Sequence, residues 1–162
     1  MFSLLIRNNL EGKLLTKSQI AERNGIDNTP NEEQLCNLKI LVIGFLQPLR
    51  DHFGLPIRIT SAFRHFSVDK ILVPNRNWEE NPSQHSKGEA ADFEITGIDN
   101  YTLACYIKDN MDFDQLILEY YEEGKPDSGW IHCSYKATGN RKEILRARRN
   151  TKGETVYSYS LD

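Results

Sequence analysis

The strongest pattern of apolar positions along the chain lies between residues 31 and 54. Apolar side chains recur there at spacings of three and four, at Leu35, Leu38, Leu41, Val42, Phe45, Leu46, Leu49 and Phe53. This spacing gives a helix one broad apolar face, so we expect a helix that packs into the core. Residues 29–32 are typical of a capped helix start, Pro48 predicts a kink, and Gly54 predicts the end of the helix.

Strands are predicted where apolar and polar positions alternate and β-branched residues are frequent. They cover residues 55–62, 90–95, 114–121 and 129–135. The last two are expected to form a hairpin around a turn. In the second strand, alternation places Asp92 and Glu94 on one face and the larger apolar side chains on the other.

The remaining segments are less regular. Residues 17–24 and 100–109 predict short helices. Residues 65–82 have no sustained period and contain two prolines and three asparagines, so they predict a long surface loop. Loops of this length in a compact domain often carry function. The last twenty residues predict a terminal extension or an edge strand.

Length and composition limit the class of protein. With 162 residues, 39% of them hydrophobic and 27% charged, the chain has the balance of a single globular domain. No apolar run approaches the ~20 residues needed to cross a bilayer. The apolar stretch in residues 1–7 is short and has no basic start. We therefore predict no signal peptide and expect synthesis in the cytoplasm.

Charge is unevenly distributed along the chain. Residues 136–152 contain seven basic residues and one acid, a net charge of +6, whereas the whole chain carries −3 and the rest of it therefore −9. Such a segment suggests contact with a polyanion, with a solvated surface as the ordinary alternative. We expect one domain, residues 1–162, with a core of about residues 26–135 and a basic C-terminal extension, 136–162.

The candidate chemistry lies in two short segments. His85 stands seven residues before Asp92, and His132 follows forty residues later. Two imidazoles and one carboxylate are enough protein ligands for a catalytic zinc that keeps one position open. His85 alone is typical of a loop histidine. Asp92, flanked by apolar residues in a strand, needs a partner if its carboxylate is buried, and a metal, a lysine or an arginine would serve.

Two further residues are candidates for catalysis. If the hairpin is symmetric about the bond between residues 125 and 126, Glu119 lies opposite His132 and beside the proposed metal. A one-residue slip would place the two side chains on opposite faces, and a solvent-facing glutamate is then the alternative. Arg64, at the end of the strand 55–62, is either a surface charge or a fork for a substrate carboxylate or a developing oxyanion.

Three sequence segments resemble a known family. They are Ser61-Ala62-Phe63-Arg64, then Ser83-Gln84-His85-Ser86-Lys87-Gly88-Glu89-Ala90-Ala91-Asp92, and Gly129-Trp130-Ile131-His132-Cys133-Ser134-Tyr135. Together they resemble the zinc D-Ala-D-Ala carboxypeptidases and L-alanoyl-D-glutamate endopeptidases, and more closely the phage-encoded and prophage-encoded members. The resemblance runs from about residue 27 to residue 135.

The resemblance implies a fold and a set of site residues. The fold is α+β, with a central antiparallel sheet and helices packed on one side, as in hedgehog and DD-peptidase-like domains. Zinc is implied on His85, Asp92 and His132, and Arg64 near the substrate's carbonyl or carboxylate. Ser83 and Trp130, within the same motifs, are expected to contact substrate.

One position departs from the family pattern. Several members place the catalytic acid three residues before the last histidine ligand, and this chain has Gly129 there. The role of general base must then pass to Glu119 or to Asp127 in the turn, and we favour Glu119.

The leading functional hypothesis is zinc-dependent hydrolysis of peptide bonds in cell-wall peptidoglycan, as a carboxypeptidase or an endopeptidase similar to phage endolysins. The expected partner is the stem peptide, with no nucleic acid and no membrane span, and a monomer is favoured. Action at the wall would follow release from the cell or delivery in a phage particle. The alternative is a non-catalytic, zinc-containing binding or virion-structural module. A DNA-binding regulator would rest only on residues 18–25, which weakly resemble half of a helix-turn-helix, and on the basic segment.

Overall fold

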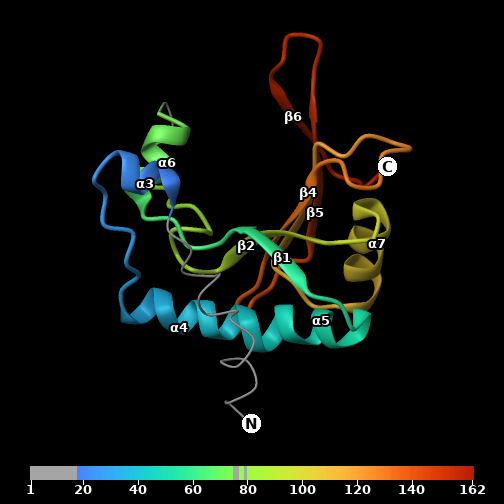
Figure 1. Ribbon diagram of the computed structural model, residues 1–162, viewed down its shortest axis with the longest axis horizontal. Coiled ribbons are helices and arrows are strands. Elements are labelled where there is room, and N and C mark those ends of the chain that lie inside the picture. The colour runs from blue at the N-terminus through green and yellow to red at the C-terminus, as the bar shows by residue number, and fades with distance from the viewer. Residues whose placement is uncertain (1–17, 75–76, 79) are drawn as a thin grey trace.

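The computed structural model describes residues 18–74, 77–78 and 80–162 (Figure 1). Residues 1–7, in which no signal peptide is predicted, and residue 17, the predicted start of the first helix, lie outside this range. The helices are α3 (Gln19–Arg23), α4 (Glu32–Leu41), the π-helical turn η1 (Val42–Leu46), α5 (Gln47–Phe53), α6 (Phe66–Leu72) and α7 (Asn100–Asn110). The strands are β1 (Ile57–Ser61), β2 (Ala90–Ile95), β3 (Gln115–Glu119), β4 (Trp130–Ser134), β5 (Glu143–Arg149) and β6 (Thr155–Ser158).

The strands form one six-stranded sheet in the order β1-β2-β4-β3-β5-β6. Neighbouring strands are antiparallel except β3 and β5, which run parallel. The α+β fold is confirmed, and the sheet is mixed at this one pair. β5 and β6, which lie in the segment expected as a basic extension, belong to this sheet, and β6 forms its outer edge.

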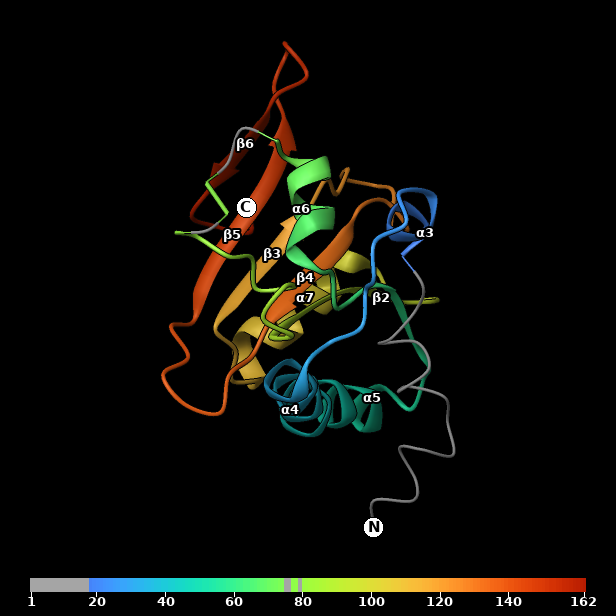
Figure 2. The same ribbon diagram turned by 90° about the vertical axis from the view of Figure 1, so that its left-hand side faces the viewer.

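One face of the sheet packs on helices and forms the core. Apolar residues of α4, η1, α5 and α7 meet alternate residues of the strands. The fully buried members include Phe45, Leu49, Leu103, Ile107, Phe93, Leu116, Leu118 and Ile131. Figures 1 and 2 show α4 and α5 running end to end along one side of the sheet, with α7 beside them. The amphipathic pattern of residues 31–54 therefore identified the main core helix correctly.

Three local features set the start, the interior and the end of the helical segment 32–53. Asn31, rather than a residue before the proline, is the N-cap, and it exchanges hydrogen bonds with Gln34 in a capping box. Pro48 lies at the start of α5, directly after the wider turn η1, which accommodates the missing backbone donor. Gly54 ends α5 in the left-handed conformation, as predicted.

The predicted loop 65–82 contains a helix. Residues 66–72 form α6. Only the second half of the predicted loop, after residue 72, is irregular among the residues that the structure describes. Proline and asparagine after residue 73 dominated the sequence pattern and obscured the short apolar repeat before them. In Figure 2, α6 lies in front of the sheet, on the side away from α4 and α5. No helix within the described residues is long and apolar enough to cross a membrane.

Candidate metal centre

The three central strands bring the candidate residues to the face of the sheet opposite the core. Asp92 on β2 pairs with His132 on β4. On the other side of β4, Ile117 on β3 pairs with His132, and Glu119 pairs with Trp130. Directly paired residues share a face, so all five side chains project to the same side.

The predicted register of the hairpin was therefore wrong by two residues. Glu119 was expected opposite His132, but Ile117 occupies that position. Because side chains alternate with a period of two, this shift leaves Glu119 on the face of His132 and moves it two residue pairs along the strand. The face was predicted correctly, and the exact partner was not.

The ligand atoms of His85, Asp92 and His132 converge on one point. His85 Nε2 lies 3.2 Å from His132 Nδ1, and Asp92 Oδ1 lies 2.9 Å from His132 Nδ1 and 3.2 Å from His85 Nε2. Tetrahedral zinc with bonds of about 2.0–2.1 Å separates its ligand atoms by about 3.3 Å. The triangle therefore has almost the size that zinc requires, and all three residues are buried.

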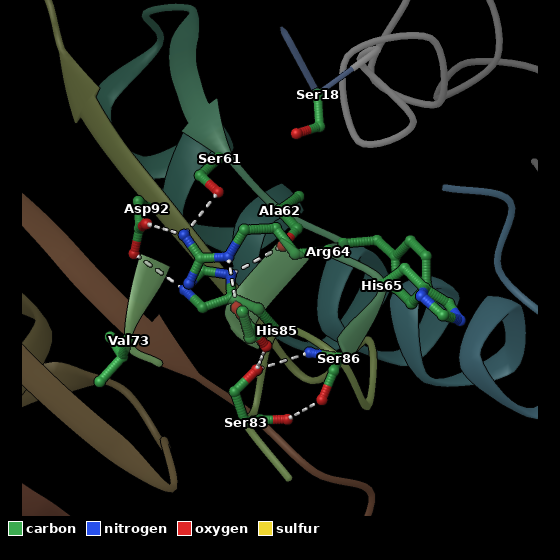
Figure 3. Close-up of polar contacts among 12 residues, drawn as sticks. Ser18, Ser61, Ala62, Arg64, His65, Val73, Ser83, His85, Ser86 and Asp92 are labelled. Atoms are coloured by element: carbon green, nitrogen blue, oxygen red, sulfur yellow. Dashed lines mark hydrogen bonds and ion pairs between the residues drawn. The ribbon is translucent and has the colours of Figure 1, made fainter. Parts of the chain in front are cut away.

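The hydrogen bonds of His85 define which of its nitrogens is free for a metal. Its Nδ1 lies 2.7 Å from the carbonyl oxygen of Ala62, which only accepts, so Nδ1 carries the proton (Figure 3). Nε2 is then left with a lone pair directed at Asp92 and His132. His132 turns Nδ1 towards this point and Nε2 towards Gln84. A cation is the natural partner of such converging acceptors.

Burial and charge both favour a cation at this point. Desolvation lowers the pKa of His85, outweighing the attraction of Asp92, so its imidazole is neutral near pH 7. Burial alone would raise the pKa of Asp92, but the electrostatic attraction of the adjacent His85 and His132 holds it well below its ordinary value, so the carboxylate is ionised. One ionised carboxylate and neutral imidazole give a buried site with negative charge.

Arg64 reaches the same site from the end of β1 (Figure 3). Its Nη1 lies 3.8 Å from Asp92 Oδ2 and donates to Ser61 Oγ at 3.3 Å, while its Nε lies 3.2 Å from Asp69 Oδ1. Asp69 comes from α6 and is only 1% exposed. The guanidinium is therefore held in place by carboxylates on both sides, with one edge lining the cleft.

The loop that carries His85 is fixed by its own hydrogen bonds. Ser83 donates its hydroxyl to Asp69 and accepts from the backbone N–H of Ser86 at 2.9 Å. Ser83 lines the cleft, but its hydroxyl is occupied by these two contacts. Gly88 has φ +76°, and a Cβ there would lie 2.4 Å from the carbonyl oxygen of Gln34 on α4. The glycine of the motif therefore lets the loop press against the core helix.

A cleft of about 910 Å³ opens over the converging ligands. Glu119, half-buried, and Trp130 line it together with the three candidate ligands. Burial raises the pKa of Glu119, and the nearby charge of Asp92 raises it further. Asp127, the alternative base, is exposed in the turn and lines a neighbouring cavity instead.

The backbone at Gly129 excludes any side chain. Its φ is +67°, and a Cβ there would lie 2.0 Å from the carbonyl oxygen of Glu119 and 2.7 Å from the backbone nitrogen of Tyr121. Tyr120, between them, also has a positive φ, of 53°. The position where several family members carry an acid is therefore built for glycine in this chain.

The sequence analysis missed three residues that organise the site. Asp69 holds Arg64 and Ser83, Gln84 contacts His132, and Asp114 contacts Gln84. Gln84 lies beside His85 in the motif, so its proximity could have been noticed. Asp69 was concealed in the predicted loop, and Asp114 lies thirty residues from its partner.

Comparison with known proteins agrees with this geometry. The family model Peptidase M15 matches residues 8–134, which is most of the chain. No curated protein matches the chain in a sequence search. Peptidases of this family depend on zinc and act on peptidoglycan-type substrates, and the buried group of His85, Asp92 and His132 can hold such a metal. The chain therefore belongs to the Peptidase M15 family of zinc metallopeptidases.

Proposed function

We propose that this metallopeptidase hydrolyses peptide bonds in the stem peptides of peptidoglycan, with zinc held by His85, Asp92 and His132. The observation that carries the proposal is the convergence of three ligand atoms within 2.9–3.2 Å of one another in a buried position. Zinc in such a site would polarise the substrate carbonyl and lower the pKa of its bound water towards about 7, so that a hydroxide nucleophile is available near neutral pH.

Glu119 is the proposed general base. It lines the cleft on the face of the ligands, and its raised pKa brings it closer to the range in which a carboxylate can both take and return a proton. It takes the proton of the attacking water and delivers it to the leaving amine. Arg64 donates to the carbonyl oxygen as negative charge develops there, and its contacts with Asp69 and Asp92 keep its fork oriented.

The shape around the site favours cleavage within a peptide. The main cleft and a second cavity of about 690 Å³ both include Asp92 and Trp130 in their walls, so the two meet beside the ligands. A peptide can then extend in both directions from the scissile bond, with Trp130 between the two halves. We therefore favour an endopeptidase over a carboxypeptidase that removes one terminal residue.

The proposed setting is the cell wall. Resemblance to phage-encoded and prophage-encoded peptidases supports an endolysin-like enzyme, a monomer that reaches the wall after release or as part of a phage particle. The stem peptide is its expected partner.

The test is turnover of purified peptidoglycan by the zinc-loaded protein, with zinc content measured in the same preparation. Glu119→Gln should lower the rate by about 10²–10⁴-fold while zinc stays at one per chain. Asp127→Asn is the matched control, because it removes the other candidate carboxylate and should leave the rate unchanged. Mass spectrometry of the products distinguishes released peptides from free terminal amino acid.

Three outcomes would contradict the proposal. Stoichiometric zinc without cleavage would favour a binding or virion-structural module. Loss of activity in Asp127→Asn with full activity in Glu119→Gln would transfer the base to the turn. Release of single terminal residues alone would make the enzyme a carboxypeptidase.

A further inference from the structure

A chain of hydrogen bonds leads from the ligand His132 along the wall of the cleft to Asp114, a buried carboxylate held by Lys136 and Arg141. Gln84 Oε1 lies 2.9 Å from His132 Nε2, the nitrogen that points away from the converging ligand atoms. The amide nitrogen of the same Gln84 donates to Asp114 Oδ2 at 3.2 Å. Gln84 therefore bridges a metal ligand on β4 and a carboxylate at the start of β3.

Asp114 is only 3% exposed and is held by two cations. Lys136 Nζ lies 2.8 Å from Oδ1, and Arg141 contacts both oxygens, with Nη2 at 2.8 Å from Oδ2 and Nε at 3.0 Å from Oδ1. Burial alone would raise the pKa of Asp114, but the hydrogen bonds and charges of Arg141 and Lys136 lower it to about 2. The carboxylate is therefore ionised at neutral pH and can only accept hydrogen bonds.

An acceptor at Asp114 fixes the orientation of the amide. A glutamine side chain has one donor side and one acceptor side, and the donor side must face the carboxylate. The acceptor oxygen of Gln84 then faces His132, so Nε2 of His132 must carry its proton. The lone pair of that imidazole is consequently on Nδ1, the atom that lies beside Asp92 and His85.

We propose that Gln84 and Asp114 are positioning residues that set the tautomer and ring orientation of His132 for metal binding. The proposal rests on the zinc site proposed above. Lys136 and Arg141, which anchor Asp114, lie beyond the part of the chain that matches the family model. Lys136 and Arg141 of the basic segment 136–152 thus bind a carboxylate of the same domain. The other basic residues of the segment are the ones left for contact with a polyanion.

The first test measures zinc affinity by competition with a chromophoric chelator. Gln84→Met keeps the length of the side chain and removes both hydrogen bonds, and it should weaken zinc binding by about 10–100-fold. Asp114→Asn should weaken it as well, because an asparagine can present either side to the amide. Lys142→Met is the matched control. It removes a charge from the same segment, where Lys142 approaches Asp112 only to 3.9 Å, and should leave affinity unchanged.

A double variant separates a relay from two independent structural effects. If Asp114 acts through Gln84, Gln84→Met with Asp114→Asn binds zinc no more weakly than Gln84→Met alone. Additive losses would show that Asp114 acts by another route and would overturn the relay. Wild-type affinity in Gln84→Met would overturn the role of Gln84.

The second test uses the wild-type protein alone and so does not depend on the folding of a variant. In zinc-loaded protein with ¹⁵N-labelled histidine, NMR should show His132 protonated on Nε2 and coordinating through Nδ1. Coordination through Nε2 would overturn the proposal while leaving the zinc site intact. A wild-type protein that binds no zinc would instead overturn the proposed function, and this inference with it.

Discussion

Replacing Gly129 should destabilise the protein far more than replacing another glycine of the same hairpin. The comparison is Gly129→Ala against Gly124→Ala, since both residues have positive φ, +67° and +77°. A Cβ at Gly124 meets nothing within 4 Å, whereas one at Gly129 would lie 2.0 Å from the carbonyl oxygen of Glu119. The pair therefore separates the conformational cost of leaving glycine from the steric cost.

The magnitudes follow from these contacts. The left-handed conformation costs a non-glycine residue about 1–2 kcal/mol, and Gly124→Ala should lose only this. To bring the contact at Gly129 back to a tolerable distance, the backbone around Glu119 must move by roughly 1 Å, with strain of about 1–3 kcal/mol. Gly129→Ala should therefore lose about 2–5 kcal/mol in total, of which about 2 kcal/mol is the steric part.

The assay is urea unfolding of the zinc-free proteins. With a slope of about 2 kcal/mol per molar urea, the extra ~2 kcal/mol moves the midpoint of Gly129→Ala about 1 M below that of Gly124→Ala. The same displacement moves the backbone of Glu119, so peptidoglycan turnover should fall in Gly129→Ala even at temperatures where it is folded. Equal midpoints for the two variants would refute the steric reasoning. Position 129 could then accommodate a side chain, including that of an acidic residue.

Three further predictions follow from the same geometry. Burial, and then the charge of Asp92, raise the pKa of Glu119, so the folded protein favours the protonated carboxyl and loses stability as pH rises through that raised pKa. Gln is neutral at every pH, so zinc-free Glu119→Gln should have a higher urea midpoint than wild type at pH 7 and the same midpoint below pH ~4. Arg64→Lys keeps the charge but loses the fork that spans Asp69, Ser61 and Asp92, so kcat/KM for peptidoglycan should fall by about 10²-fold with zinc content unchanged. Free zinc at 100 times its Kd should add about 2.7 kcal/mol to the free energy of unfolding and raise Tm by about 5–10 °C, and thermal scans of Asp92→Asn should lack this rise.

Much of the fold could be predicted from local patterns. The strands around Asp92 and His132 and the core helix before Gly54 were found because their apolar periods reflect burial of one face. Residues 66–72 were not recognised as a helix because the proline-rich stretch after them was given more weight. An edge strand in the last twenty residues was one of the two expectations and corresponds to β6, but β5 was not predicted. The basic side chains of β5 concealed it, although Arg146 and Arg148 have hydrogen-bond partners within the C-terminal segment, the carbonyl oxygen of Leu161 and the hydroxyl of Ser158.

The ligands of the site were easier to predict than their supports. His85 and Asp92 belong to one compact sequence motif and His132 to a second, and their roles as ligands remain predictions that the geometry supports. The contacts of Asp69 and Asp114 join segments with no shared period, so no local pattern could indicate them. Such partners depend on the packing of α6 and the start of β3 against the loop of the motif.

Gly129 occupies the position where several family members carry the catalytic acid, and it also contacts the backbone of Glu119, the proposed replacement for that acid. A Cβ there would collide with the backbone of Glu119 and Tyr121, so the two strands can approach this closely only with glycine at this position. The register of the hairpin pairs Glu119 with Trp130 and keeps its side chain on the face of His132. A slip of one residue would reverse the face of Glu119 and bury the wrong side of β3. The glycine that excludes an acid at its own position therefore permits the close backbone contact next to which Glu119, the proposed base, projects to the face of His132.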